Sequence, residues 1–204
     1  MSAKRRLAFG IGINDANYST KITRKVNGKE ILAWACPFYS RWHSMLSRCY
    51  SKKTLDRQKS YEGCEVCFEW LRFSVFRAWM KSQDWEGKQL DKDIIAPGNK
   101  TYSPNTCAFV ERTVNMFLVN SSDAVGSHPL GVAWNKPRKK FVAHCGNPFT
   151  GRCEHLGNFN NPADAHQAWR RRKHQLACIH ADAQKDLRVA KALRERFAEK
   201  TYAA

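Results

Sequence analysis

The sequence predicts an α+β protein, and three observations lead to that class. Apolar residues recur at helical spacing in segments such as residues 37–50, whereas they alternate along short runs between residues 131 and 159. The 204 residues are 43% hydrophobic and 12% aromatic, which is enough to bury one ordinary core or two small ones. Asn, Ser, Gly and Pro gather at residues 120–129, as in a linker. We therefore expect a mixed N-terminal domain, followed by a small three-stranded antiparallel sheet packed on a helix, with a further C-terminal helix.

The first segment, residues 1–33, mixes Gly, Asn, Ser and Thr with basic residues and has no sustained period. We expect a basic, poorly ordered arm that contains one short hairpin. Asn27-Gly28 is the turn signal of that hairpin, because both residues tolerate the positive φ angles that tight hairpin turns require.

Residues 34–119 are predicted to form the N-terminal domain, which begins with an amphipathic helix over Pro37–Tyr50. Arg41 and Arg48 are expected to lie away from its apolar stripe. The stripe comprises Phe38, Trp42, Met45, Leu46 and Cys49. A polar loop over residues 51–60 and a short strand follow, and then a second amphipathic helix. That helix carries Trp70, Phe73, Phe76, Arg77 and Met80.

The stretch from residue 90 to residue 115 is too polar and too rich in turn residues for a core element, although apolar pairs flank it. It is predicted as a short strand, a loop and the start of a helix. Gly98-Asn99 and Ser103-Pro104 turn the chain within it. Polar residues from the whole stretch are thereby expected to gather at one site. They are Asp91, Lys92 and Asp93 at the strand end, Asn105 before the helix and Asn115 at its close.

After the predicted linker, residues 130–180 contain three short β-like runs followed by a helix. Asn161 can cap this helix, Pro162 suits its first position, and Asp164 complements the positive end of the helix dipole. Small residues along the helix are expected to let it lie close against the sheet. A final helix is predicted over residues 181–204, either as a solvated face or as a packing arm.

The charge balance narrows the choice of partner. Lysine and arginine total 35 against 18 aspartate and glutamate residues, a formal net charge of +17. Nucleic acid is the expected partner, although some basic proteins are simply soluble and cationic. No apolar run is long enough to span a membrane and no secretory signal is recognisable, so we expect no membrane partner and a cytoplasmic location. The eight cysteines are then reduced thiols or metal ligands rather than disulfides.

Four short motifs follow one another in the second half of the chain. They are Gly131-Val132, Lys140-Phe141-Val142-Ala143, Leu156-Gly157-Asn158-Phe159 and Ala165-His166-Gln167-Ala168-Trp169. Together they resemble the DNA-binding domain of the plant ethylene-response-factor type, which recurs in phage and mobile-element endonucleases. The resemblance implies double-stranded DNA as the partner.

Four further motifs precede residue 115. They are Trp42-x-x-Met45-x-x-Arg48-Cys49, Val66-Cys67-x-Glu69-Trp70-x-x-Phe73, Leu90-Asp91-Lys92-Asp93 and Tyr102-x-Pro104-x-x-Cys107. This part of the chain resembles phage proteins related to HNH endonucleases, which implies an HNH-like domain of the ββα-metal type. Proteins with this pairing of domains are homing or free-standing endonucleases. The resemblance implies hydrolysis of DNA phosphodiester bonds with a divalent metal, Mg²⁺ or Mn²⁺.

In an HNH site a histidine deprotonates the attacking water, a divalent cation polarises the phosphate, and an asparagine orients the histidine or binds the metal. The resemblance places Asp91 at the acidic metal ligand, Asn105 at the structural asparagine and Asn115 at the last Asn or His position. Lys92 falls where the histidine belongs, and a lysine near phosphate serves more readily as a clamp than as a base. Either Asp93 or a metal-bound hydroxide takes over as base, or the site only binds.

The cysteines of the N-terminal half allow two interpretations. Cys64 and Cys67 have the spacing of a zinc knuckle, and Cys49 and Cys107, or His43, are candidates to complete a tetrahedral site. Small thiols equally suit an apolar core, so structural Zn²⁺ and plain core packing both stay open.

For DNA contact, the predicted sheet and its turns offer cationic side chains at strand spacing, which suits a β-ribbon reader in the major groove. The candidates are Trp134, Lys136, Arg138, Lys139, Lys140 and Arg152. Trp134 is alternatively a core residue. A helical cluster is expected to neutralise phosphates rather than to read bases. It comprises Arg170, Arg171, Arg172 and Lys173.

We therefore expect a DNA-binding, phage-type HNH or homing endonuclease. The alternative is a non-catalytic DNA-binding regulator derived from such a nuclease. In a structural interpretation of the same loop, the carboxylates of Asp91 and Asp93 are held by salt bridges with Lys92 and Arg112.

Overall fold

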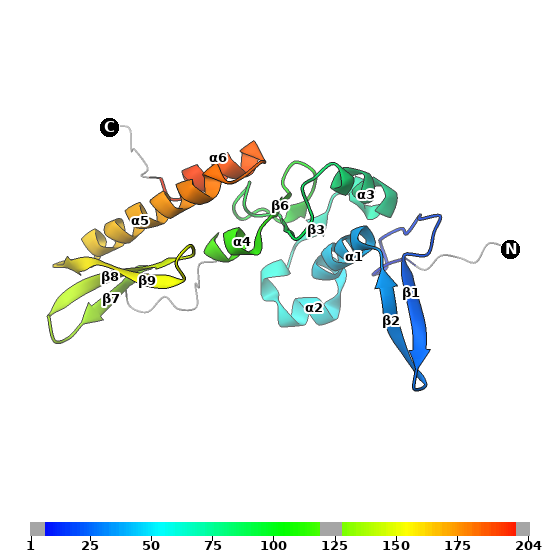
Figure 1. The fold of residues 1–204 in the computed structure, drawn as a ribbon, viewed down its shortest axis with the longest axis horizontal. Coiled ribbons are helices and arrows are strands. Elements are labelled where there is room, and N and C mark those ends of the chain that lie inside the picture. Colours follow the sequence, from blue (N-terminus) through cyan, green and yellow to red (C-terminus); the bar gives the residue numbers. More distant parts are fainter. Residues whose placement is uncertain (1–6, 119–127, 199–204) are drawn as a thin grey trace. The chain divides into compact units, whose positions relative to one another are not determined.

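The structure, a computed structural model, describes residues 7–118 and 128–198. The chain divides into two compact units, Met1–Val110 and Glu111–Ala204. Helices and strands occur in both units (Figure 1), so the predicted α+β class is confirmed.

The first unit is built from short elements. Its strands are β1 (Lys21–Val26), β2 (Lys29–Ala35), β3 (Glu65–Val66), β4 (Gln89–Asp91), β5 (Thr101–Tyr102) and β6 (Ala108–Val110). Its helices are α1 (Pro37–Tyr50), α2 (Lys52–Arg57) and α3 (Phe73–Lys81), and two 3₁₀ turns are η1 (Lys59–Tyr61) and η2 (Phe68–Leu71). The described strands of this unit pair in twos: β1 with β2 and β4 with β6 run antiparallel, whereas β3 and β5 run parallel.

The core of the first unit forms where α1 packs against α3, as the helical periodicity predicts. Trp42 and Trp70 are fully buried, and the Trp42 Nε1 group donates a 2.7 Å hydrogen bond to the Trp70 carbonyl. The Trp70 ring also contacts Phe76 and Trp79, with ring centroids 5.1 and 4.4 Å apart. Burial of these large apolar side chains is the main favourable contribution to folding in a unit whose strands are so short.

The hairpin that the sequence predicts is formed by β1 and β2. Asn27 and Gly28 make its turn with φ angles of 49° and 75°, in the left-handed region that Asn and Gly tolerate best. The base of the hairpin is closed by a 2.9 Å hydrogen bond from the Cys36 amide to the Thr20 carbonyl. Figure 1 shows the two strands extending away from α1.

Residues 7–20 are part of the first unit rather than of a separate arm. Ala8 and Gly12 form a β-bridge, so this segment has a defined backbone. Gly12 lies against the core, where a Cβ atom would collide with Trp42 and Leu46. The predicted poorly ordered arm is therefore wrong for this segment, because its apolar residues pack on the core of the first unit.

Three further local predictions are wrong in the first unit. Residues 51–60 are not a loop, because α2 and η1 occupy most of them. The residues after Asn105 form strand β6 before any helix begins, since β6 pairs with β4. Arg48 does not lie away from the packed side of α1, because its Nη1 atom donates to the Leu90 carbonyl at 3.4 Å.

The second unit contains a three-stranded antiparallel sheet and three helices among its described residues. Its elements are α4 (Arg112–Leu118), β7 (Val132–Asn135), β8 (Lys140–Asn147), β9 (Arg152–Phe159), α5 (Pro162–Asp182) and α6 (Leu187–Arg196). The strand order is β7-β8-β9, and α5 packs against the sheet (Figure 1). The predicted sheet packed on a helix is thereby confirmed.

The start of α5 follows the capping pattern of the sequence. The Asn161 Oδ1 atom accepts the Asp164 amide hydrogen at 2.8 Å, and Pro162 lies in the first turn. Close approach of the helix to the sheet requires a glycine as well. Gly131 has a left-handed φ of 78°, and a Cβ atom there would overlap the ring of Trp169.

The boundaries of the second unit differ from the predicted ones. α4 belongs to this unit, although the sequence places residues up to 119 in the N-terminal domain. The residues predicted as one helix from position 181 are divided, because α5 ends at Asp182 and α6 begins at Leu187. Residues 120–127, which are most of the predicted linker, lie outside the described residues. Within residues 7–118 and 128–198, no helix combines the length and the apolar content needed to cross a membrane.

Candidate functional site: the Asp91 loop and the exposed sheet

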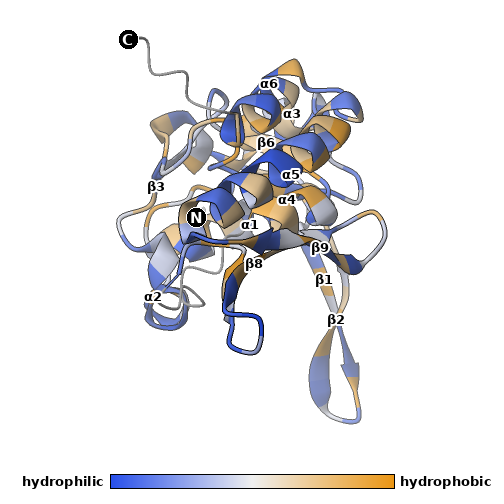
Figure 2. Cartoon of the chain, turned by 90° about the vertical axis from the view of Figure 1, so that its left-hand side faces the viewer, coloured by the Kyte–Doolittle hydropathy of each residue, from blue (hydrophilic) through white to orange (hydrophobic). Residues whose placement is uncertain are grey.

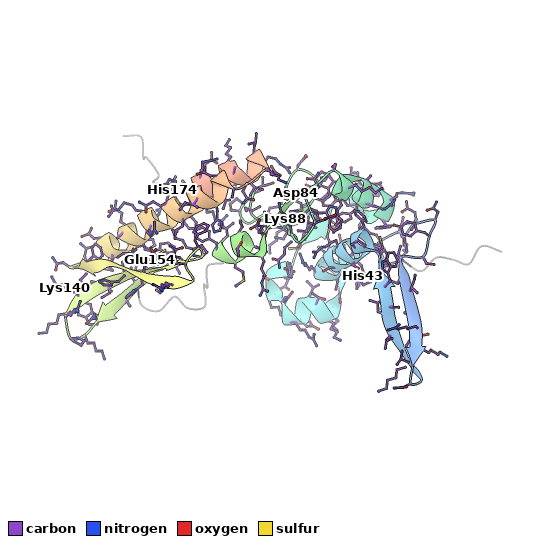
Figure 3. All side chains as sticks on the ribbon, viewed as in Figure 1. His43, Asp84, Lys88, Lys140, Glu154 and His174 are labelled. Carbon is purple, nitrogen blue, oxygen red and sulfur yellow. The ribbon has the colours of Figure 1, made fainter. Side chains whose placement is uncertain are left out.

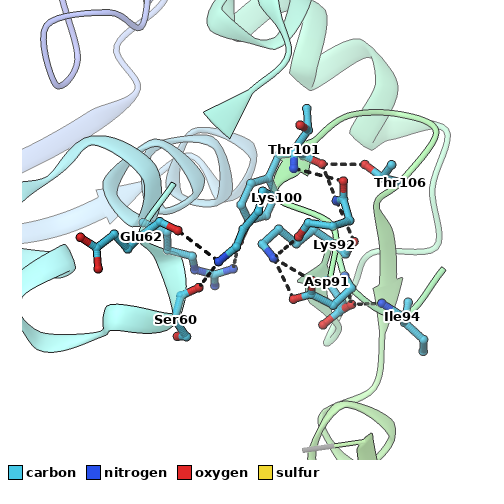
Figure 4. A network of polar contacts seen from close by, with 12 residues as sticks. Ser60, Glu62, Asp91, Lys92, Ile94, Lys100, Thr101 and Thr106 are labelled. Carbon is cyan, nitrogen blue, oxygen red and sulfur yellow. Dashed lines mark hydrogen bonds and ion pairs between the residues drawn. The ribbon is translucent and has the colours of Figure 1, made fainter. Parts of the chain in front are cut away.

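The loop that follows β4 is organised by the carboxylate of Asp91. Its Oδ1 atom accepts the amide hydrogens of Asp93 and Ile94 at 2.8 and 2.7 Å (Figure 4). This local arrangement turns the chain directly after the strand, as Asp side chains commonly do. Burial raises the pKa of the Asp91 carboxyl, and the two backbone hydrogen bonds partly oppose that rise.

Lys92 is buried, with 4% of its surface exposed. Its Nζ atom donates to both carboxylate oxygens of Asp93 at 2.8 and 2.9 Å and to the Asn99 carbonyl at 2.6 Å. An ammonium group has three donors, so these contacts occupy all of them. The prediction of Lys92 as an exposed phosphate clamp is therefore wrong, because its ammonium group is buried and its three donors are all used within the loop. Lys92 and Arg112 are the two predicted salt-bridge partners of the loop carboxylates. The structure shows the salt bridge of Lys92, which pairs with Asp93.

Asn99 closes the loop from its other side. Its Nδ2 group donates to the carbonyls of Lys92 and Thr101 at 3.0 and 2.7 Å, and its Oδ1 atom accepts the Thr101 amide hydrogen at 3.1 Å. Thr106 adds a 2.8 Å hydrogen bond from its hydroxyl to the same Thr101 carbonyl (Figure 4). Residues 92–101 are thus held by side chains within the loop itself. The sequence indicates Gly98-Asn99 only as a turn.

A second set of contacts fixes the strands on which the loop is mounted. The Arg48 guanidinium donates at 3.4 Å to the Leu90 carbonyl and to the Tyr102 hydroxyl. Burial raises the pKa of the Tyr102 hydroxyl above its ordinary range. Lys100 donates to the carbonyls of Ser60 and Glu62, both at 3.1 Å (Figure 4). These cations therefore satisfy backbone carbonyls of the fold.

The structure does not gather the predicted catalytic set within one unit. Asn105 is exposed on the turn before β6 in the first unit, whereas Asn115 and Arg112 lie on α4 in the second unit. The only histidine among residues 1–110 is His43, whose ring contacts are with Phe9 and Tyr39 rather than with the loop (Figure 3). Burial lowers the pKa of His43. Within the described part of the first unit, no histidine therefore stands at the Asp91 loop.

The donor atoms around Asp91 bear on the divalent metal that the HNH resemblance implies. Asp91 Oδ1 is used by two amides, and both oxygens of Asp93 face the Lys92 ammonium. Within the described ranges, no group of three or more His, Cys, Asp or Glu side chains is placed to hold a metal ion. Asp91 Oδ2 is the remaining carboxylate oxygen that the loop could offer to a metal ion, and the buried Lys92 ammonium lies in the same loop. This arrangement does not fit a divalent metal centre of the HNH kind.

The four cysteines proposed for zinc all lie in or against the core of the first unit. Cys49, Cys64 and Cys107 are buried and Cys67 is half-buried. Burial raises the pKa values of the Cys49 and Cys107 thiols to about 12, so both are protonated at neutral pH when no cation is bound. This geometry suits small core side chains, and zinc binding stays a prediction.

The sheet of the second unit has one side toward α5 and one toward solvent. Glu154 defines the helix side, because its carboxylate accepts hydrogen bonds from the Arg172 guanidinium at 2.6 and 2.9 Å (Figure 3). Cross-strand partners share a side and neighbours along a strand alternate. His144 and His155 pair across β8 and β9, next to the Cys145–Glu154 pair, and both are exposed. They therefore mark the solvent side of the sheet.

The turn between β7 and β8 carries three exposed cations. Lys136, Arg138 and Lys139 are exposed, and none forms an ion pair or side-chain hydrogen bond with another described residue. Asn135 shapes the turn by accepting the Arg138 amide hydrogen at 3.1 Å. Lys139 has a left-handed φ of 49°. The backbone is thus fixed while three cationic heads point into solvent.

Two other predicted DNA contacts at this end of the sheet are partly engaged. Trp134 is 42% exposed, and its ring lies 4.8 Å from that of Phe141. It is therefore neither a buried core residue nor a fully free one. Lys140 donates to the Asn160 side chain.

The predicted phosphate-binding cluster on α5 is mostly used inside the unit. Arg172 is paired with Glu154, and the interaction holds the pKa of that carboxyl at about 2. Lys173 donates to the Phe117 carbonyl at 2.8 Å and lies 3.6 Å from the centroid of that ring. Arg170 donates to the Ala198 carbonyl at 2.9 Å. Arg171 is the exposed member of the cluster.

Arg152 differs from the turn cations in its surroundings. It lines an open groove of about 510 Å³ together with Arg112 and Lys173. By strand alternation it shares the side of Glu154, not that of the two histidines. Arg152 therefore lies on the opposite side of the sheet from the two histidines, and its contact with DNA stays a prediction.

Comparison of the chain with protein-family models, with curated proteins and with solved structures gave no match. The functional interpretation consequently depends on the described residues themselves. Sequence reasoning missed the loop-closing role of Asn99 and the contact of Arg48 with the Leu90 carbonyl, because no local pattern marks either of them.

Proposed function

We propose that this chain binds double-stranded DNA through the solvent side of the β7-β8-β9 sheet and the turn between β7 and β8. The observation that carries the proposal is a group of three exposed cations on that turn that pair with no other described side chain, Lys136, Arg138 and Lys139. They project from a backbone that Asn135 and two flanking strands hold in place. Because the backbone of the turn is already held, contact with phosphates requires ordering of the side chains but not of the main chain.

The form and the charge of the chain support the same partner. A β-sheet face can enter the major groove, where side chains meet base edges, while cations at its ends contact phosphates. The formal charge of +17 adds a long-range attraction to any polyanion. α5 occupies the other side of the sheet and stiffens it, which preserves the spacing of the contacting side chains.

The test is a binding titration of labelled duplex DNA at several salt concentrations. Each phosphate contact contributes a slope of about −0.9 to log affinity against log salt, so loss of three contacts reduces the slope by about 3. We expect this change in the triple variant Lys136→Ala, Arg138→Ala, Lys139→Ala.

The matched control is the triple variant Lys52→Ala, Lys53→Ala, Arg57→Ala, which removes the same charge from exposed positions of α2. It is expected to change affinity far less than the turn variant. Equal effects of the two variants would show that overall charge alone accounts for binding. A binding curve that is insensitive to salt would refute the proposal altogether.

Hydrolysis of DNA by an HNH-type endonuclease is the second candidate, and one observation favours it. Asp91 Oδ2 accepts no hydrogen bond from another described residue, whereas Oδ1 accepts two. The Asp91 loop lacks a histidine and does not fit the expected metal centre, so we derive no catalytic step. A non-catalytic DNA-binding protein therefore agrees better with the loop geometry than an HNH endonuclease does.

The two candidates separate in one assay. Supercoiled plasmid is incubated with the full chain and Mg²⁺ or Mn²⁺, beside an EDTA control. Asp91→Asn keeps an oxygen for the two backbone amides but removes the charge, and Asp56→Asn at an exposed position is the matched control. Metal-dependent nicking that is lost in Asp91→Asn and kept in Asp56→Asn would establish the endonuclease. No nicking by a chain that binds DNA is the result expected here.

A further inference from the structure

The β1–β2 hairpin is exposed on both of its sides. Every residue of β1 and all but the last residue of β2 are exposed. The apolar side chains among them include Ile22, Leu32 and Trp34, which are 52%, 59% and 43% exposed. An isolated two-stranded hairpin has no core of its own in which to bury these side chains. Exposed apolar residues at this density indicate an interaction surface.

The register of the hairpin shows how its residues are distributed. Ile22, Arg24 and Val26 lie on one side of β1 by strand alternation, and they pair with Trp34, Ile31 and Lys29. Cross-strand partners share a side, and an irregularity in register between Ile22 and Thr23 brings Trp34 to the side of Ile31 and Lys29. In Figure 2, both apolar and polar residues occur along β1 and β2. One side of the ribbon therefore presents four apolar side chains interleaved with two cations.

The charge of the hairpin decides between two possible occupants of this surface. Residues 21–35 contain four Lys and Arg against one Glu. A second copy of the chain packed on the same side would bring Arg24 and Lys29 against like charges, at a cost of several kcal/mol for a desolvated arrangement. A polyanion would neutralise them instead. The apolar side chains between the cations can contact base edges and thymine methyl groups.

We infer that the β1–β2 hairpin is a second DNA-contacting element, a two-stranded ribbon that enters the major groove of the duplex bound by the β7-β8-β9 sheet. The inference rests on the proposed function. Strands of this length extend about 20 Å at roughly 3.3 Å per residue, and two strands lie about 5 Å apart, so the ribbon fits a groove about 12 Å wide. Arg24 and Lys29 are then the phosphate contacts, and Ile22 and Trp34 lie nearer the hairpin base.

The first experiment shortens the hairpin without disturbing its base. Lys21 and Ala35 are cross-strand partners, so Asn27-Gly28 can join them directly once residues 22–26 and 29–34 are removed. The removed residues are exposed, so the shortened chain is expected to unfold at the same temperature as the full chain. We expect its affinity for duplex DNA to fall at least tenfold in 100 mM salt and its protected footprint to become shorter.

The second experiment uses point variants, so that it does not depend on the folding of the shortened chain. Arg24→Ala with Lys29→Ala should reduce the salt slope by about 2, because two phosphate contacts are lost. Lys52→Ala with Lys53→Ala removes the same charge from α2 and is the matched control.

The outcomes distinguish the hairpin from the sheet. If the full chain does not bind duplex DNA, the proposed function itself fails. If it binds, and the hairpin variants keep the affinity, slope and footprint of the full chain, only the hairpin inference is overturned. A chain that is dimeric in sedimentation, and that becomes monomeric with unchanged DNA affinity when the hairpin is shortened, would instead identify the ribbon as a contact between copies.

Discussion

Lys92 is the residue for which the HNH resemblance and the structure give opposite expectations. As an exposed clamp on phosphate, its loss would lower DNA cleavage or binding and leave folding unchanged. In the structure its ammonium group is buried and joins Asp93 to the Asn99 carbonyl across the loop. We therefore predict that Lys92→Met and Lys92→Ala destabilise the first unit.

The size of the effect follows from what each variant removes. Lys92→Met keeps an unbranched side chain but leaves the Asn99 carbonyl without its donor, which costs about 1–3 kcal/mol. The Asp93 side chain is 48% exposed, so its freed carboxylate is solvated and the lost ion pair adds only about 0–1 kcal/mol. Lys92→Ala also removes roughly three buried methylene groups at about 0.8 kcal/mol each, for a total loss of about 3–6 kcal/mol.

Thermal unfolding of the full chain, followed by circular dichroism, measures the difference. For a domain of about 100 residues, 1 kcal/mol shifts the midpoint by about 4–8 °C, so Lys92→Ala should lower the midpoint of the first unit by at least about 12 °C. Lys53→Ala on exposed α2 is the control and should stay within about 0.5 kcal/mol of the parent. An unchanged midpoint in Lys92→Ala, together with weaker DNA binding or cleavage, would refute the structural role and restore the clamp.

Three further predictions concern other parts of the chain. Gly131→Ala should destabilise the second unit by about 2 kcal/mol or more, because its Cβ meets Trp169; Gly151→Ala, which also has a positive φ but an open surrounding, should cost clearly less in the same unfolding assay. The Arg172 pair lowers the pKa of Glu154 from 4.5 to about 2, so its stabilisation is present above pH 4.5 and is lost as the pH falls toward 2; the difference in midpoint between the parent and Glu154→Gln should shrink over that range. Elemental analysis of protein purified without added metal should show no stoichiometric zinc if Cys49, Cys64, Cys67 and Cys107 are core residues, whereas one zinc per chain would assign them as ligands.

The sequence by itself determined those features in which the local chain carries its own physical signal. The spacing of Trp42, Met45 and Cys49 is enough to predict α1, because a helix with one apolar stripe must bury it. Asn27-Gly28 predicts the hairpin turn and Asn161 predicts the start of α5, since both signals act within a few residues. The net charge is likewise a property of the sequence alone.

Only the tertiary structure decided what the polar residues of the candidate site do. The sequence alone suggests that the Lys92 ammonium group is available for binding. In the fold, Asn99, seven residues later, lies beside Lys92, and its carbonyl accepts a hydrogen bond from that ammonium group. In the sequence, Arg172 and Lys173 are likewise part of a basic run. In the fold, each has a partner from a distant segment: Arg172 pairs with Glu154, and Lys173 donates to the Phe117 carbonyl. A long cationic side chain has no local preference that fixes its partner, because the partner is chosen by long-range packing and by the cost of leaving a buried polar group unsatisfied.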